Sequence, residues 1–171
     1  MEVCSGRRTL PCMLSAGTTP GLRSRLVTES AANCITHALG LILSLIGAPI
    51  LVVLASRIGD AGHIAGCSVY SASLILLFTA STYYHLHEGK PGENRRLILD
   101  HICIYLLIAG TYSAFCLTSL RGTWGWVLVT AIWALAMGGV AFKLRFGIRY
   151  ERFSTALYII MGWLAFFSLL S

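Results

Sequence analysis

Charged residues are scarce in this sequence. Only 12% of the 171 residues are Asp, Glu, Lys or Arg, roughly half the share of a typical soluble domain, whereas 56% are hydrophobic. Its long apolar runs also lack the alternation of polar and apolar residues that barrel strands require. Because unpaired backbone amides are too costly in hydrocarbon, such runs must be helical. The sequence therefore predicts transmembrane helices and excludes a soluble fold.

Motifs for cysteine chemistry and for nucleic-acid binding are absent as well. The six cysteines form no C-x-x-C pair and no finger-like spacing, and most fall in or beside apolar runs, where small packing residues are expected. The net charge of +6 is spread over the tail and the loops instead of forming one basic patch. We therefore expect no nucleic-acid partner.

Five apolar runs are long enough to cross a bilayer. They lie near residues 34–55, 63–86, 100–118, 123–142 and 154–171. Residues 1–28 are basic and rich in Ser, Thr, Gly and Pro, lack the apolar core of a signal peptide, and are expected to form a disordered tail. Residues 29–171 are expected to form the membrane domain. The predicted fold class is all-α, a polytopic transmembrane helix bundle.

Lysine and arginine are distributed unevenly between the two sides of these spans. Eleven lie in the N-terminal tail, the loop after the second span and the loop after the fourth, whereas only Arg57 and Arg121 lie on the other side. Loops rich in Lys and Arg remain cytoplasmic during insertion. The distribution predicts a cytoplasmic N-terminus.

Polar residues gather at the predicted cytoplasmic ends of three spans. They are Glu29, Asn33 and His37 of the first span, Ser81 and His85 of the second, and Asp100, which opens the third. The first three residues are spaced i, i+4 and i+8, and the next two are spaced i, i+4. Each set therefore lies on one helix face. Such groups inside a membrane are costly and usually pair, bind ions or line a wet cavity.

Two interpretations of these polar residues remain open. Each residue can be an inexpensive interfacial group, such as a helix cap or a snorkelling histidine. Alternatively, they share a site for a divalent metal such as zinc, which imidazole and carboxylate groups bind well. One or two histidines do not complete a catalytic zinc site, which normally has three protein ligands.

The motifs E-x-x-x-N-x-x-x-H and S-x-x-x-H, followed by Asp100, resemble those of a known family. It is the hemolysin III branch of the progestin and adipoQ receptor superfamily. The resemblance covers residues 29–171 and includes further stretches: STYYH at 81–85, LDHICIYLLIAGTY at 99–112, WALA at 133–136 with Lys143, and LYIIMGW at 157–163. The pair Ser113-Ala114 departs from the Thr-Pro that the family pattern leads us to expect.

This resemblance implies a seven-span bundle with a zinc ion near its cytoplasmic face. It implies that His85 is a zinc ligand and that the candidate catalytic residues are Asp100, which contacts a metal-bound water, and Ser81, which supports it. Two more histidine ligands belong to an H-x-x-x-H motif on the family's seventh span. Because the sequence ends at Ser171, we expect either a fragment or a natural truncation that alone binds zinc weakly or not at all.

Three functions are compatible with the resemblance. The first is zinc-dependent hydrolysis of a lipid-like amide, such as a ceramide, by the intact protein. The second is a pore-forming or haemolytic activity, which is poorly supported because the polar residues lie at one end of the spans instead of along them. The third is a receptor-like signalling module with structural zinc. In each case we expect an integral protein of a bacterial plasma membrane whose partner is membrane lipid.

Overall fold

The computed structural model of the chain describes residues 20–120 and 122–169, with side chains over 29–57, 59–120 and 122–164. Within these ranges it is helical apart from short turns, which confirms the all-α prediction. The helices are α2 (Pro20–Ile58), α3 (Ala61–Leu86), α4 (Glu93–Thr118), α5 (Thr123–Phe146) and α6 (Glu151–Leu169). The five predicted spans overlap these five helices in order.

Four described helical segments are long and apolar enough to cross a membrane. They are Glu29–Arg57, Ala61–Leu86, Glu93–Thr118 and Thr123–Phe146. The large side chains on their outer surfaces are mostly Leu, Ile, Val, Phe and Trp, as contact with lipid requires. The chain is therefore a polytopic helical membrane protein.

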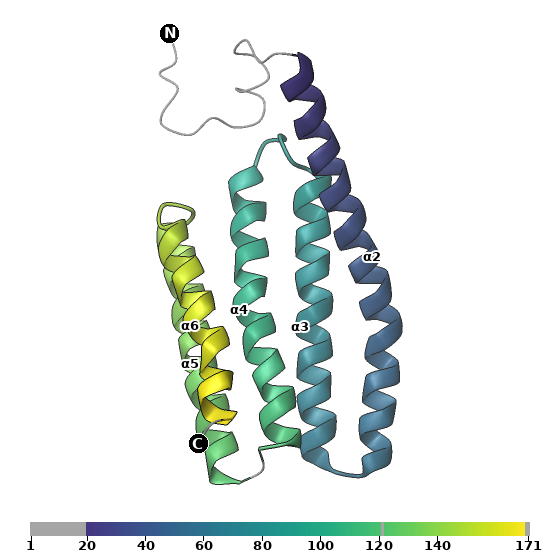
Figure 1. The fold of residues 1–171 in the computed structure, drawn as a ribbon, viewed down its shortest axis with the longest axis vertical. Helices are drawn as coiled ribbons and strands as arrows, with labels where there is room; N and C mark the ends of the chain where they lie inside the picture. The colour runs from purple at the N-terminus through teal and green to yellow at the C-terminus, as the bar shows by residue number, and fades with distance from the viewer. Residues whose placement is uncertain (1–19, 121, 170–171) are drawn as a thin grey trace.

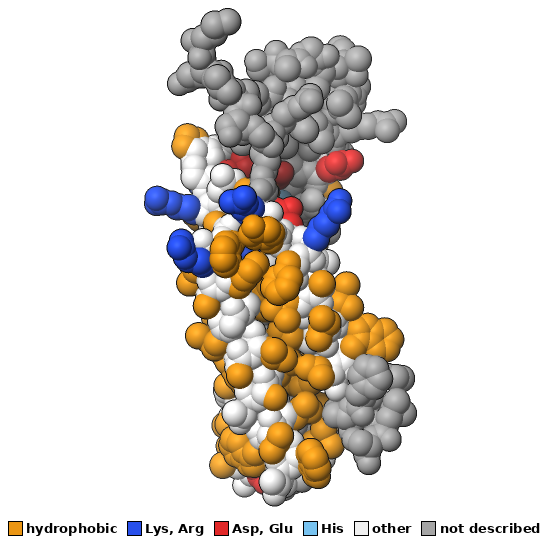
Figure 2. Space-filling view, turned by 90° about the vertical axis from the view of Figure 1, so that its left-hand side faces the viewer, with side chains coloured by type: hydrophobic (Ala, Val, Ile, Leu, Met, Phe, Trp, Pro, Cys, Tyr) orange, Lys and Arg blue, Asp and Glu red, His pale blue; other side chains and the backbone are white. Residues whose placement is uncertain are grey.

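Successive helices run antiparallel, and α2, α3 and α4 stand side by side in Figure 1. The most extensive contact is between α3 and α4, while α5 and α6 both pack against α4. One end of the bundle therefore gathers the residues around Glu29, the α3–α4 loop (87–92) and the α5–α6 loop (147–150). We call this the polar end. Most of the charged side chains visible in Figure 2 lie there, above a mainly hydrophobic surface.

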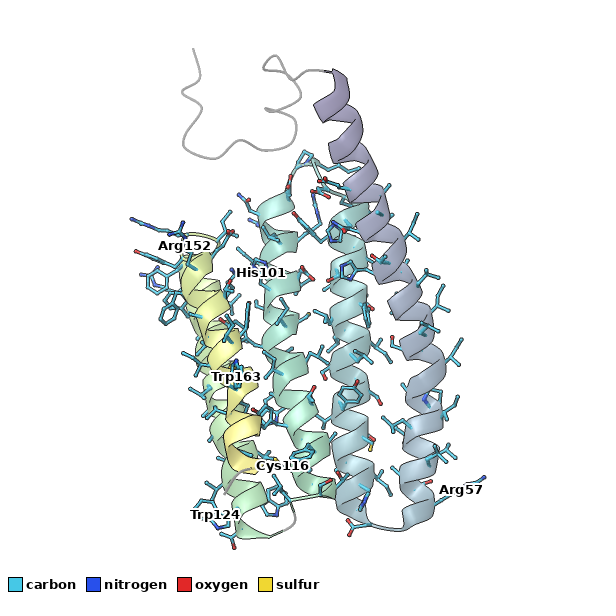
Figure 3. The ribbon with its side chains drawn as sticks, in the orientation of Figure 1. Arg57, His101, Cys116, Trp124, Arg152 and Trp163 are labelled. Carbon is cyan, nitrogen blue, oxygen red and sulfur yellow. The ribbon has the colours of Figure 1, made fainter. Side chains whose placement is uncertain are left out.

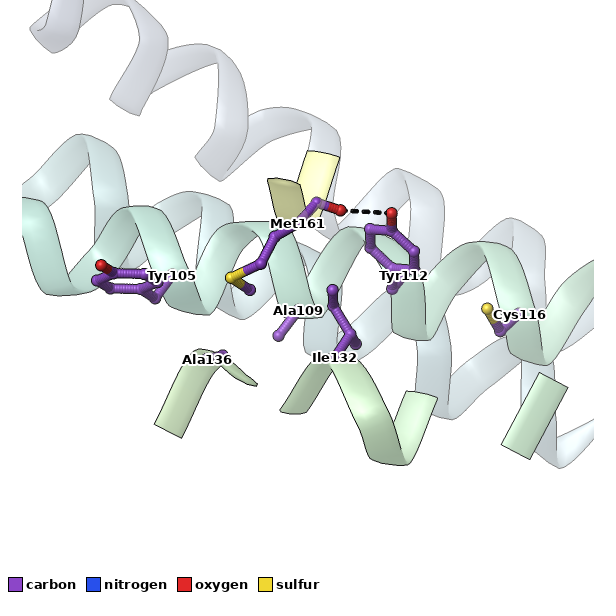
Figure 4. Close-up of a cluster of buried hydrophobic side chains, with 7 residues drawn as sticks. All are labelled: Tyr105, Ala109, Tyr112, Cys116, Ile132, Ala136 and Met161. Atoms are coloured by element: carbon purple, nitrogen blue, oxygen red, sulfur yellow. Dashed lines mark hydrogen bonds between the residues drawn. The ribbon is translucent and has the colours of Figure 1, made fainter. Parts of the chain in front are cut away.

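The best-buried core lies where α4, α5 and α6 meet, as Figure 4 shows. Its residues are Tyr105, Ala109, Tyr112, Cys116, Ile132, Ala136 and Met161. The Tyr112 hydroxyl donates a hydrogen bond to the carbonyl of Met161 at 2.6 Å, which joins α4 to α6. Trp133 of α5 donates to the Ser113 hydroxyl of α4 at 2.9 Å. These contacts fix the helix that carries Asp100.

Two helices begin before the apolar runs that identified them. α2 begins at Pro20, inside the segment assigned to the tail, whereas residues 1–19 lie outside the described residues. α4 begins at Glu93, so Asp100 lies about two turns inside the helix and does not open it. Hydropathy detects only the part of a helix that faces lipid. It therefore did not reveal the polar first turns of these two helices.

Candidate functional site

A hydrogen bond between Ser81 and Asp100 joins α3 to α4 near the polar end. The buried Ser81 hydroxyl donates to Oδ1 of Asp100. Because Asp100 lies two turns inside α4, its carboxylate is within the bundle, where a polar group needs a partner. Ser81 supplies that partner, so these two residues lie together as their shared motif suggested.

His85 lies one turn beyond Ser81 on α3 and contacts α2. Its ring stacks on the ring of His37, with centroids 5.2 Å apart and an interplanar angle of 14°. Its Nδ1 is 3.4 Å from Oε2 of Glu88, and the two side chains are only 13% and 18% exposed. The structure therefore brings together Ser81, His85 and Asp100 from two helices and adds His37 from a third.

The His37 ring of α2 packs against side chains of α3. It contacts Phe78 at a centroid distance of 6.1 Å in addition to His85. Its Nδ1 is buried and has no hydrogen-bond partner among the described residues. Buried polar atoms nearly always have a partner, so this nitrogen is available to bind a ligand or an ordered water.

Glu88 was not identified from the sequence, yet it connects two parts of the site. Its Oε2 accepts a hydrogen bond from the hydroxyl of Ser30 on α2 at 2.7 Å and also faces Nδ1 of His85. The i, i+3 spacing from His85 was the available signal, but this contact depends on a loop conformation that periodicity does not specify. Glu88 thereby links α2 to the edge of the His85 ring.

Glu29 and Asn33 do not join His37 in the cluster. Both are exposed, and neither side chain makes a described contact with Ser81, His85 or Asp100. The reason is geometric: α3 ends at Leu86, one residue after His85, whereas Asn33 and Glu29 lie about 6 and 12 Å beyond His37 along α2. No turn of α3 faces them at that height.

The remaining histidines also lie apart from the cluster. His63 is at the opposite end of α3, where its Nδ1 lies 3.8 Å from Oδ1 of Asp60. His87 begins the α3–α4 loop, and its Nδ1 is 3.0 Å from the carbonyl oxygen of Tyr83. His101, labelled in Figure 3, follows Asp100 on α4, and its carbonyl accepts a hydrogen bond from Tyr158 of α6.

The donors in the cluster fit part of a zinc site. The imidazole of His85 is a suitable zinc ligand, and the carboxylate of Asp100 can bind zinc or hydrogen-bond to one of its ligands. No group of three or more His, Cys, Asp or Glu side chains that could hold a metal ion occurs among the side chains described. Since a catalytic zinc normally has three protein ligands, these residues do not complete such a site by themselves.

Sequence comparison identifies relatives of this chain in bacteria and in animals. The profile of a family described as "Haemolysin-III related" matches residues 26–171. "Hemolysin-3" of Bacillus cereus is 47% identical over 141 residues, which cover 82% of this chain and 64% of that protein. The "Hemolysin-3 homolog" of Bacillus subtilis is 40% identical over 138 residues, covering 81% of this chain and 65% of the relative.

A more distant relative is the human "Monocyte to macrophage differentiation factor". It is 27% identical over 139 residues, which cover 78% of this chain and 57% of the human protein. The chain thus spans less than two thirds of the length of the curated relatives it matches. No solved structure is significantly similar to it.

Proposed function

This chain belongs to the Haemolysin-III related family, and from that premise we propose that it carries part of the active site of a zinc-dependent membrane hydrolase acting on lipid-like amides. The observation that carries the proposal is the polar cluster. The Ser81–Asp100 hydrogen bond and the His37–His85 stack unite polar side chains of three apolar helices at one depth. Groups this costly inside a membrane usually serve a function.

Asp100, Ser81 and His85 have distinct roles in this proposal. Amide hydrolysis breaks the C–N bond, transfers the oxygen of water to the carbonyl carbon and delivers a proton to the leaving amine. Asp100 accepts the proton from the attacking water. Ser81 orients Asp100 by donating to its Oδ1, which leaves the second carboxylate oxygen available for that proton.

His85 provides one imidazole ligand for zinc, and the other ligands come from parts of the intact protein beyond this chain. Zinc, when bound, would polarise the substrate carbonyl and promote deprotonation of water. Glu88 accepts a hydrogen bond from Nδ1 of His85, which leaves Nε2 as the nitrogen that binds the metal. Because this chain supplies too few ligands, we expect it to bind zinc weakly when isolated.

A groove between α2 and α3 supports the proposal that the substrate has a long apolar chain. Its volume is about 340 Å³, and it is lined mainly by small and aliphatic residues of the two helices, such as Gly47 and Leu74. Phe78 both lines the groove and contacts His37. An acyl chain in the groove would therefore have its polar group beside the cluster.

We also propose that the polar end faces the cytoplasm of a bacterial cell. The support is the grouping of Lys90, Arg95, Arg145, Arg149 and Arg152 at that end, since cytoplasmic loops carry an excess of Lys and Arg. The active site would then lie in the cytoplasmic leaflet of the plasma membrane.

The test is lipid-amide turnover by an intact family member in proteoliposomes, with Asp100→Asn compared with Asp60→Asn. Asp60 lies at the opposite end, where it caps α3 by accepting from the amide of Gly62, and Asn is an equally good cap. We expect Asp100→Asn to lower turnover by roughly 100-fold or more, Asp60→Asn to leave it unchanged, and chelation of zinc to abolish it.

Turnover that survives both Asp100→Asn and chelation would contradict the proposed mechanism. Bound zinc without turnover of any lipid amide would instead favour a signalling module with structural zinc. Ion conductance that is insensitive to chelation would favour a pore.

A further inference from the structure

The turn between α5 and α6 carries a cluster of packed aromatic rings outside the proposed active site. Phe142 lies 4.7 Å from Phe146 and 4.7 Å from Phe153 between ring centroids, and Phe146 lies 5.7 Å from Tyr150. Although they pack together, Phe146, Tyr150 and Phe153 remain 46%, 45% and 54% exposed. Of these residues, Tyr150 is of the type that is enriched at the boundary between acyl chains and headgroups, and the exposed phenylalanines beside it offer apolar contact area.

Three exposed arginines lie on the same stretch of chain as these rings. They are Arg145 in the last turn of α5, Arg149 in the turn itself and Arg152 in the first turn of α6. The guanidinium carbon of Arg149 lies 5.6 Å from the centroid of the Tyr150 ring, so an aromatic face supports it. Arg152 projects outward from this end of the bundle in Figure 3.

A hollow on the same turn has two of these arginines in its wall. Its volume is about 500 Å³, and its lining consists of Ile148, Arg149, Tyr150, Glu151, Arg152 and Phe153. Glu151 is the single acidic residue between positions 141 and 160, so the region is strongly basic. The guanidinium group presents a planar fork of donors that matches the oxygens of a phosphate.

Arg96, in the first turn of α4 beside the α3–α4 loop, is used differently. Arg96 donates hydrogen bonds to the carbonyls of Pro91, His87 and Lys90 and so stabilises the α3–α4 loop. That loop has a hollow of its own, but its lining from Gly89 to Arg95 contains no aromatic residue. Aromatic rings, exposed guanidinium groups and a hollow occur together at the α5–α6 turn and not at the α3–α4 loop.

We propose that the α5–α6 turn binds the headgroup of an anionic phospholipid. The aromatic rings contact the upper acyl chains, while Arg149 and Arg152 bind the phosphate at the rim of the hollow. The charge of the lining and the position of the turn at the end of a span both match a lipid in the surrounding leaflet. This site is separate from the polar cluster and does not depend on hydrolase activity.

The experiment compares two double variants with the same change in charge, Arg149→Gln with Arg152→Gln, and Lys90→Gln with Arg95→Gln. Each protein is reconstituted in nanodiscs of equal parts phosphatidylcholine and phosphatidylglycerol, and retained lipids are counted by native mass spectrometry. We expect the wild-type chain to retain phosphatidylglycerol selectively and the arginine pair variant to lose affinity on the order of tenfold. The variant with Lys90→Gln and Arg95→Gln should lose much less affinity for phosphatidylglycerol.

Equal losses in the two double variants would overturn the proposal, because they would reflect general surface charge. Retention that inorganic phosphate abolishes would also overturn it, since the site would then bind a free anion. If the glutamine variant does not fold, Arg149→Lys with Arg152→Lys provides the same test. It preserves the charge but removes the guanidinium forks, and unchanged phosphatidylglycerol retention by this variant would contradict the proposed phosphate contact.

Discussion

Helices α4 and α2 contribute to the same polar cluster but are packed very differently. α4 contacts α3, α5 and α6, whereas the contacts of α2 are chiefly with α3. In the most apolar window of each helix, 33% of the residues of α4 but only 11% of those of α2 are buried. Asp100 is therefore fixed by the core, while His37 depends on one helix contact. Changes on the two helices should differ in their effects on stability and on the site.

The largest effect on stability is expected at the α4–α5 contact. A Cβ atom at Gly139 would lie 2.4 Å from the ring of Tyr105, and that ring is fully buried and has no room to move. Gly139→Leu should therefore lower the free energy of unfolding by about 3 kcal/mol. The measurement is thermal unfolding in detergent micelles.

Gly138→Leu is the matched control for this substitution. It makes the same change one residue earlier, at a position where a Cβ atom would meet nothing within 4 Å. It should leave the unfolding temperature nearly unchanged. Equal destabilisation by both substitutions would show that the α4–α5 contact is not as close as described.

A smaller loss of stability is expected for Gly40→Leu on α2. A Cβ atom here would also lie 2.4 Å from a ring, that of Phe78, but Phe78 borders the groove and α2 has room to shift. We expect about 1 kcal/mol of destabilisation together with a change in the His37–His85 stack, visible in the NMR shifts of the imidazoles.

Gly47→Leu is the control for Gly40→Leu. It lies at an open position on the same helix and should leave the NMR shifts of the imidazoles unchanged. A loss of stability in Gly40→Leu as large as that in Gly139→Leu would contradict the expected difference between α2 and α4.

The smallest effect on stability is expected for Glu88→Ala, which removes a link between α2 and the α3–α4 loop. Loss of the contacts with Ser30 and His85 should cost about 0.5 kcal/mol. The more specific result is a change in the tautomer of His85, because its Nδ1 loses an acceptor; nitrogen NMR measures this directly. Glu93→Ala is the control, since Glu93 accepts from the amide of Gly89 and not from a histidine. An unchanged tautomer in Glu88→Ala would refute the orienting role.

The sequence predicted the helices better than it predicted the site. Five apolar runs located the helices because lipid requires continuous apolar surface, but they did not reveal the polar first turns of α2 and α4. The spacing of Ser81 and His85 correctly put both on the face of α3 that meets its neighbours. For the stripe on α2, periodicity could not reveal where α3 ends, so only His37 of its three residues reaches the cluster. Glu88 was not identified from the sequence because its position depends on the conformation of the α3–α4 loop.

The most direct test of the central claim is the zinc content and lipid-amide turnover of an intact family member carrying His85→Ala, with His87→Ala as the matched control. His87 is two residues away in the chain, but its ring contacts Tyr83 and not His37. The expected result is that His85→Ala loses both the bound zinc and the turnover, while His87→Ala keeps both. Full zinc occupancy and normal turnover in His85→Ala would contradict it.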